Sequence, residues 1–137
     1  MKRVLIDTNI VVDFFLKQPD FFEAADRVFQ RIKNRTIVGC LSASVVTDLY
    51  YIIGRKTTEG YARAIVEDIY ATFRILTVDR RLIREALDRA MPDFEDALQA
   101  VSAARIGVEN VITRDVKGFT GSGLRVYSPE EFLEEWE

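Results

Sequence analysis

The chain has 137 residues, of which 48% are hydrophobic and 30% charged, and it carries a net charge of −3 with no histidine. This length and apolar content fit one folded domain over residues 1–137 and exclude an intrinsically disordered chain. Without histidine, Ser-His-Asp and Cys-His triads and imidazole zinc sites are excluded, so any chemistry rests on carboxylates, hydroxyls, Lys, Arg or a hard metal.

Charge balance and cysteine content also restrict the setting of the protein. Nineteen Lys and Arg against 22 Asp and Glu argue against tight, sequence-independent coating of DNA, which needs a basic face. Cys40 is the only cysteine, which excludes an intrachain disulfide and fits a reducing cytoplasm. No apolar run approaches the roughly 18 residues of a membrane span, and the N-terminal apolar segment is too short for a signal peptide. We therefore expect a cytoplasmic protein without membrane contact.

The first half of the chain predicts a strand, two helices, a second strand and two more helices. Their ranges are 3–6, 9–16, 20–34, 36–40, 42–55 and 57–73. The helix at 57–73 has the clearest pattern, because Tyr61, Ile65, Ile69 and Phe73 recur every four residues after a Thr cap.

The second half predicts a strand, two helices, a strand, a loop, a strand and a short helix. Their ranges are 74–78, 79–91, 93–106, 110–113, 114–123, 124–127 and 128–137. Strands that alternate with helices, each strand short and uniformly apolar, predict an α/β domain with a parallel sheet of about five strands covered on both faces.

Acidic residues follow three of the predicted strands. Asp7, Asp79 and Asp115 come after the first, third and fourth strands. Ligands of open parallel sheets bind outside the carboxyl ends of the strands, near the point where strand order reverses. Each residue also has a structural explanation: Asp7 and Asp79 can cap helices, and Asp115 can be a turn residue. We assign Asp79 to a cap and keep both explanations for the other two.

Further acids lie on predicted helices. Asp93 and Asp96 are three residues apart in the first turn of helix 93–106 and share a face, which either a cap or a site explains. Asp48 lies on a stripe with Ser44 and Arg55, which a solvated helix face also explains.

The acids are more informative together than singly. If Asp7, Asp96 and Asp115 meet at one edge of the sheet, their repulsion is costly unless a cation lies between them. Oxygen ligands favour Mg²⁺ or Mn²⁺, which can activate water and bind phosphate oxygens. We then expect Asp7→Asn or Asp115→Asn to stabilise the metal-free protein while abolishing any chemistry that depends on the metal.

Four segments carry a family resemblance. "VLIDTNIVVDF", "SASVVTDLYYII", "DFEDALQAVSAARIGVENVITRDVKGF" and "VYSPEEFLEEW" together resemble a PIN domain, the fold of the VapC-type toxin ribonucleases. The resemblance covers nearly the whole chain in the same order. It implies a three-layer α/β/α sandwich with a central parallel sheet, and cleavage of single-stranded RNA that depends on Mg²⁺ or Mn²⁺. It also implies that the chain could be the toxin of a toxin–antitoxin pair.

The resemblance assigns roles to residues by their position in these motifs. The implied catalytic residues are Asp7, Asp48, Asp96 and Asp115. The implied metal ligands are Asp7, Asp96 and Asp115, with Asp93 as an accessory acid, and the supporting residues are Thr8, Asn9, Ser44 and Thr113. The family most often has Glu where Asp48 stands, so we expect Asp48 to reach a metal only through water.

Other residues are candidates for contacts with RNA. Arg55, Arg114 and Lys117 could meet phosphates, and Tyr51 or Phe119 could stack on an unpaired base. Solvated charges and core packing explain these residues equally well.

Aromatic residues concentrate in the two early helices, at Phe14, Phe15, Phe21 and Phe22. PIN toxins use their early helices for homodimer contacts and antitoxin binding, and the same surface is a candidate here. Simple core packing is the equal alternative.

Three other functions compete with the nuclease. A catalytically weak or inactive PIN-like module that binds RNA would explain Asp48 in place of Glu. A haloacid-dehalogenase-like phosphatase needs an Asp where Asn9 stands. A receiver domain lacks its acidic pair and its Lys, although Asp79 could mimic the phosphoacceptor.

Overall fold

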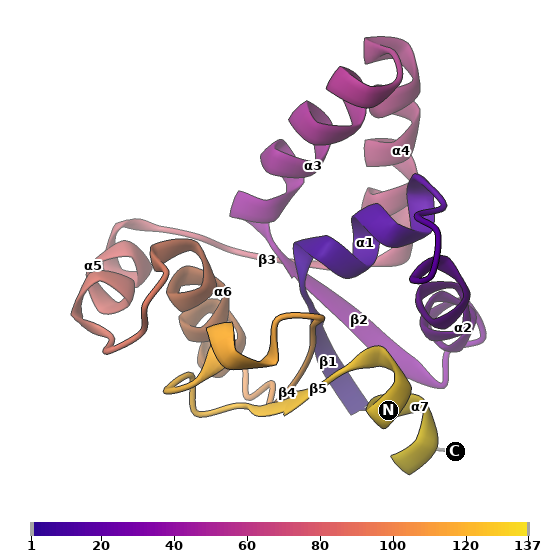
Figure 1. The fold of residues 1–137 in the computed structure, drawn as a ribbon. Helices are drawn as coiled ribbons and strands as arrows, with labels where there is room; N and C mark the ends of the chain where they lie inside the picture. Colours follow the sequence, from indigo (N-terminus) through magenta and orange to yellow (C-terminus); the bar gives the residue numbers. More distant parts are fainter. Residues whose placement is uncertain (1, 137) are drawn as a thin grey trace.

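The computed structural model describes residues 2–136 and has a five-stranded parallel sheet at its centre (Figure 1). The strands are β1 (Lys2–Ile6), β2 (Ile37–Ser42), β3 (Arg74–Leu76), β4 (Asn110–Ile112) and β5 (Arg125–Tyr127). They are hydrogen-bonded in the order β3-β2-β1-β4-β5. The predicted α/β class with a central parallel sheet of five strands is confirmed.

Helices cover both faces of this sheet. They are α1 (Thr8–Phe15), α2 (Phe22–Lys33), α3 (Ala43–Lys56), α4 (Glu59–Thr72), α5 (Arg80–Asp88), α6 (Phe94–Arg105) and α7 (Pro129–Glu135). Successive strand residues point to opposite faces. Val4 and Ile6 therefore pack with α1 to α4 and α7, whereas Leu5 packs with α6. All three side chains are fully buried, which explains the uniformly apolar first strand and gives the predicted three layers.

Polar caps begin several helices where the sequence predicts them. The Asp79 carboxylate accepts a hydrogen bond from the Leu82 N–H at 3.0 Å, and Asp93 accepts one from the Asp96 N–H at 2.9 Å. Ser128 begins α7 with a reciprocal capping box. The assignment of Asp79 to a cap is thereby confirmed.

Several boundaries differ from the sequence prediction, for example the end of β2 at Ser42 and of α5 at Asp88. The expected loop at 114–123 contains a short 3₁₀ helix, η1 (Val116–Phe119), because the Asp115 carboxylate caps it by accepting from the Gly118 N–H. The third strand ends at Leu76, since Asp79 already begins α5 three residues later. The last position of the predicted helix 128–137 lies outside the described residues.

Strand order reverses between β1 and β4. From β1 the chain builds β2 and β3 on one side, and it then returns to place β4 on the other side of β1. The register pairs Ile6 with Ile112, and the Asp7 N–H donates to the Ile112 carbonyl at 3.0 Å. The residues that follow these two strands are therefore neighbours at the carboxyl edge of the sheet.

Among residues 2–136, no helix combines the length and the apolar character needed to cross a membrane.

Candidate active site

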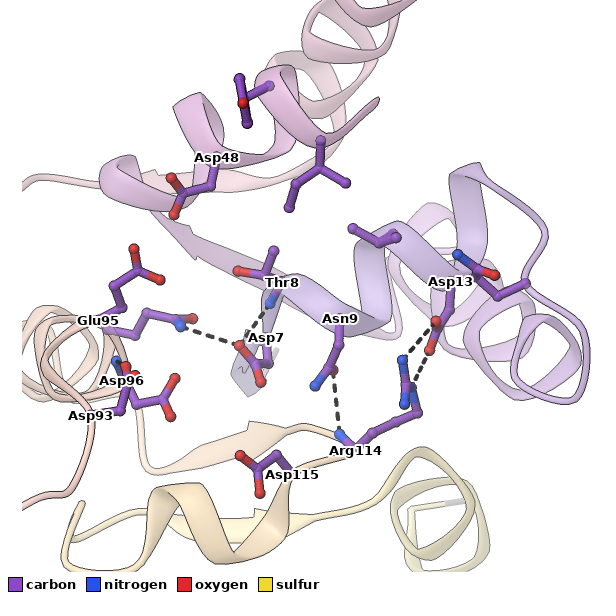
Figure 2. A pocket seen from close by; sticks show the side chains of 15 residues that line it. Asp7, Thr8, Asn9, Asp13, Asp48, Asp93, Glu95, Asp96, Arg114 and Asp115 are labelled. Atoms are coloured by element: carbon purple, nitrogen blue, oxygen red, sulfur yellow. Dashed lines mark hydrogen bonds and ion pairs between the residues drawn. The ribbon is translucent and has the colours of Figure 1, made fainter. Parts of the chain in front are cut away.

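A cavity of about 530 Å³ opens at the carboxyl ends of β1 and β4 (Figure 2). Seven carboxylates line it: Asp7, Asp13, Asp48, Asp93, Glu95, Asp96 and Asp115. They come from α1, α3, α6 with its N-cap, and the segments after β1 and β4, so the five acids to which the resemblance assigned catalytic or metal-binding roles all reach one space. Two further carboxylates, those of Asp13 and Glu95, were not predicted.

Asp7 is the most firmly held of these acids. Its side chain is 6% exposed and accepts hydrogen bonds from the Thr8 N–H at 2.8 Å, Gln99 Nε2 at 3.2 Å and Thr113 Oγ1 at 2.7 Å. These donors offset the cost of burying the charge and fix the direction of the carboxylate.

Asp115 is held by its own loop. Its N–H donates to Thr113 Oγ1 at 2.9 Å, and its Oδ1 accepts from the Gly118 N–H at 3.1 Å. A Cβ atom at Gly118 would lie 2.9 Å from Asp115 Cγ and 3.1 Å from Asp96 Oδ2. Glycine at 118 therefore keeps open the space between the carboxylates of Asp96 and Asp115.

Asp96 has the most strongly raised pKa among the acids of this site. It lies in the first turn of α6, after the capping residue Asp93. Burial, together with the negative charges of Asp7, Asp93, Asp115 and Glu95, raises the pKa of Asp96 to about 7. Near neutral pH, about half of the protein molecules therefore carry a protonated Asp96 carboxyl group. A cation in the cavity would favour the charged form of this group.

Asp48 and Glu95 face one another across the cavity. Figure 2 shows the Glu95 side chain directed toward Asp48, which lies on α3. The charge of Asp48, followed by burial, raises the pKa of Glu95. Glu95 thus places a longer carboxylate beside the shorter Asp48. Its position next to Asp96 in the first turn of α6 is the only signal in the sequence that pointed to it.

The expected supporting residues act in different ways. Thr113 bonds the Asp7 carboxylate through its hydroxyl, whereas Thr8 does so through its backbone N–H. Asn9 lines the cavity, but its Oδ1 accepts from the Arg114 N–H at 3.3 Å. The Ser44 hydroxyl shares a hydrogen bond with that of Ser42 at 2.8 Å.

Gln99 is another residue of the cavity that was not predicted. It is 2% exposed, and its Nε2 holds Asp7, while its Oε1 is buried without a hydrogen-bond partner among the described residues. Its position three residues after Asp96 on α6 puts it on the same helix face, which is a signal that the sequence contained.

The candidate RNA contacts divide between the cavity and its surroundings. Arg114 lines the cavity, while Arg55 and Lys117 lie outside its lining. Tyr51 also lines it, is 61% exposed and accepts a hydrogen bond from Arg55 Nη1 at 2.9 Å. Phe119 is 1% exposed and packs in the core under β4, so the idea that it stacks on a base is wrong.

The early aromatic residues divide between core and surface. Phe14 stacks on Phe29 with ring centroids 3.9 Å apart, and Phe15 and Phe22 pack around it. Phe21 remains 42% exposed beside Arg114. Core packing therefore explains three of the four.

The donor set fits a hydrated cation. Within residues 2–136, no three acidic side chains lie close enough to hold an ion directly between them. Mg²⁺ keeps several of its waters and binds proteins through one or two carboxylates, so wider spacing with water between the ion and the remaining acids suits it. An ion of this kind with its waters would fit within the cavity of about 530 Å³ that these acids line.

Sequence comparison identifies the family. The family model described as PIN domain matches residues 3–117, so the chain belongs to the PIN domain family. No curated protein matches this chain significantly.

Solved structures share the fold. VapBC2 from Rickettsia felis, bound to a DNA fragment from its promoter, has 16% identity and a TM-score of 0.69, with 92% of this chain and 98% of that chain covered. DNA-bound VapBC from Salmonella typhimurium has 17% identity and a TM-score of 0.70, with 94% and 99% covered. A toxin–antitoxin complex from Klebsiella pneumoniae has 21% identity and a TM-score of 0.66, with 92% and 97% covered. At these identities the likeness shows the fold alone.

Proposed function

We propose that this PIN domain is an endoribonuclease that cleaves single-stranded RNA with Mg²⁺ or Mn²⁺, and that it is the toxin of a toxin–antitoxin pair. The observation that carries the proposal is the meeting of Asp7, Asp96 and Asp115 at the point where strand order reverses. The pKa of Asp96, raised to about 7, supports a site built to receive positive charge. The toxin–antitoxin complexes among the structural neighbours support the biological setting.

In this proposal four acids hold the ion, some of them through water: Asp7, Asp93, Asp96 and Asp115. When bound, the ion would supply water activation and neutralise charge on the phosphate. Three donors keep the Asp7 carboxylate in one direction, so it would meet the ion without reordering. Gly118 keeps the space beside Asp96 and Asp115 free.

The proposed contacts with RNA lie around the mouth of the cavity. Arg55 and Lys117 would meet phosphates, and Tyr51 would stack on an unpaired base, a contact open only to single strands. An antitoxin and a second copy of the chain are the proposed protein partners.

Asp7→Asn is expected to reduce cleavage of a labelled single-stranded RNA by at least about 100-fold. The cause is the loss of one carboxylate charge at the centre of the site. Cleavage is measured with Mn²⁺, with Mg²⁺ and with EDTA, and the parent should cut only with metal. Asp88→Asn on the exposed face of α5 is the matched control and should cut like the parent. Cleavage in EDTA, or an active Asp7→Asn, would contradict the proposal.

A second candidate is an RNA-binding module that has lost catalysis, because Asp48 is shorter than the usual Glu. The same assay separates the two, since this module would bind RNA without cutting it in either metal.

Asp48→Ala is expected to weaken Mn²⁺ affinity and cleavage by about 10-fold each if Asp48 acts through water, as outer-shell groups do. Calorimetry gives the affinity and the RNA assay gives the rate. Unchanged values for both would remove Asp48 from the site.

Gly118→Ala is expected to weaken Mn²⁺ binding by about 10-fold or more, because the new methyl group must displace the Asp115 carboxylate. Calorimetry without RNA measures it. Gly60→Ala on α4 is the control, since a Cβ there meets nothing within 4 Å. Equal affinities in the two variants would show that the space beside Gly118 is not used.

A further inference from the structure

The Arg114 side chain forms an ion pair with Asp13 on α1 (Figure 2) and also lies beside the Phe21 ring. Its Nε donates to Asp13 Oδ2 at 2.6 Å and its Nη2 donates to Asp13 Oδ1 at 3.1 Å. Its guanidinium carbon also lies 4.0 Å from the centre of the Phe21 ring. Asp13 is on α1 and Phe21 immediately precedes α2, so Arg114 ties both to the segment after β4. A two-point pair of this kind fixes orientation as well as distance.

The neighbours of Arg114 are tied to the segment after β1 as well. The Arg114 N–H donates to Asn9 Oδ1, and Thr113 Oγ1 donates to Asp7 Oδ2. The ladder between β1 and β4 ends at Ile112, so beyond it these side-chain contacts set where Asp115 lies relative to Asp7.

A direct role for Arg114 on phosphate would compete with these contacts. Asp13 is 1% exposed, and Arg114 supplies both hydrogen bonds of its carboxylate and its only salt bridge among the described residues. Moving the guanidinium onto RNA would leave a buried charge unpaired, which is strongly unfavourable. The geometry therefore favours a fixed guanidinium over one that follows the substrate.

We propose that Asp13 and Arg114 form a positioning pair that holds Asp115 in register with Asp7 and Asp96. The inference rests on the proposed function for its catalytic consequence. Displacement of a carboxylate by about 1 Å can cost about 100-fold in rate, so the pair acts through Asp115 rather than through RNA.

The test compares Asp13→Asn and Arg114→Lys with the parent. Lysine keeps the positive charge but lacks the planar fork, so it separates charge from geometry. The readouts are kcat and KM for single-stranded RNA, Mn²⁺ affinity without RNA, and hydrogen exchange of the Gly118 amide, which donates to Asp115 Oδ1 at 3.1 Å. Arg84→Gln, which removes an exposed ion pair with Asp88 on α5, is the matched control.

Both variants are expected to lower kcat at least 10-fold with KM within twofold, to weaken Mn²⁺ affinity severalfold and to speed Gly118 exchange at least 10-fold. The control should match the parent in all three. A raised KM with unchanged kcat would show that Arg114 binds phosphate, and a lower melting temperature alone would show a merely structural pair. Either result overturns the proposal.

Failure of the proposed function gives a different result. A parent that binds no Mn²⁺ and cuts no RNA contradicts the nuclease, while Gly118 exchange still reports whether the pair positions Asp115. If hydrogen exchange of the Gly118 amide is unchanged in both variants, the positioning pair is overturned, whether or not the parent binds Mn²⁺ and cuts RNA.

Discussion

Arg114→Gln is expected to lower the free energy of unfolding by about 3–5 kcal/mol, the range for a buried charge that has lost its partner. Asp13 is almost fully buried, whereas the Arg114 side chain is 35% exposed. Asp13→Asn should therefore cost less, about 1–2 kcal/mol, because the arginine it leaves can be hydrated. Urea unfolding at neutral pH measures both.

The double variant Asp13→Asn/Arg114→Gln should recover much of the loss, since neither side chain is then charged. Breaking the exposed pair with Arg84→Gln should change stability by no more than about 1 kcal/mol. If Asp13→Asn proves as damaging as Arg114→Gln, the difference in burial is not what governs this pair.

Asp96→Asn is expected to stabilise the metal-free protein above neutral pH. The pKa of Asp96 is about 7 in the fold against an ordinary value of 3.8, so the folded protein binds a proton that the unfolded chain releases. Stability from this group is present below about pH 4 and is lost as pH rises to about 7. The variant removes this loss, and after allowance for screening of a half-exposed group we expect a gain of about 1–2 kcal/mol at pH 8 in EDTA.

Urea unfolding at pH 5 and pH 8, with EDTA and with Mn²⁺, tests this prediction. The parent should lose stability between the two pH values in EDTA and regain it with Mn²⁺, while Asp96→Asn should lose less with pH and regain less with Mn²⁺. A variant less stable than the parent at pH 8 would mean that the charge of Asp96 at the N-terminus of α6 matters more than repulsion.

The structure changes which substitution is expected to relieve charge repulsion: Asp96→Asn instead of Asp7→Asn. From the sequence, neutralising Asp7 should relieve repulsion. In the fold Asp7 accepts three hydrogen bonds, and an amide would turn an N–H₂ group toward donors. Asp7→Asn is therefore expected to cost stability, and Asp96, whose pKa is strongly raised, is where repulsion can be relieved.

The regular elements followed from the sequence because their signals are local. Four-residue spacing of apolar side chains marked α4, and the capping residues Asp79 and Asp93 marked the starts of α5 and α6. The 3₁₀ helix η1 was not predicted, because its cap is a single hydrogen bond from the Gly118 N–H to the Asp115 carboxylate. A single contact of this kind leaves no periodic pattern in the sequence.

The sequence by itself determined which chemical groups the protein has for a site: carboxylates after strand ends, no imidazole, and a hydroxyl and amides beside the acids. It also placed Asp7 and Asp115 at the same edge of the sheet, because parallel strands end together. Spacing along a helix reports which residues share a face, so it could place Asp93 beside Asp96.

Only the tertiary structure decided which distant groups meet. Glu95 faces Asp48 because α3 and α6 line the same cavity at the carboxyl edge of the sheet, and Arg114 meets Asp13 because β4 returns beside β1. These pairs are separated by 47 to 101 positions in the chain, a span over which no periodicity operates. Their contacts are set by strand order and helix packing, and burial then determines how strongly each pair of charges interacts.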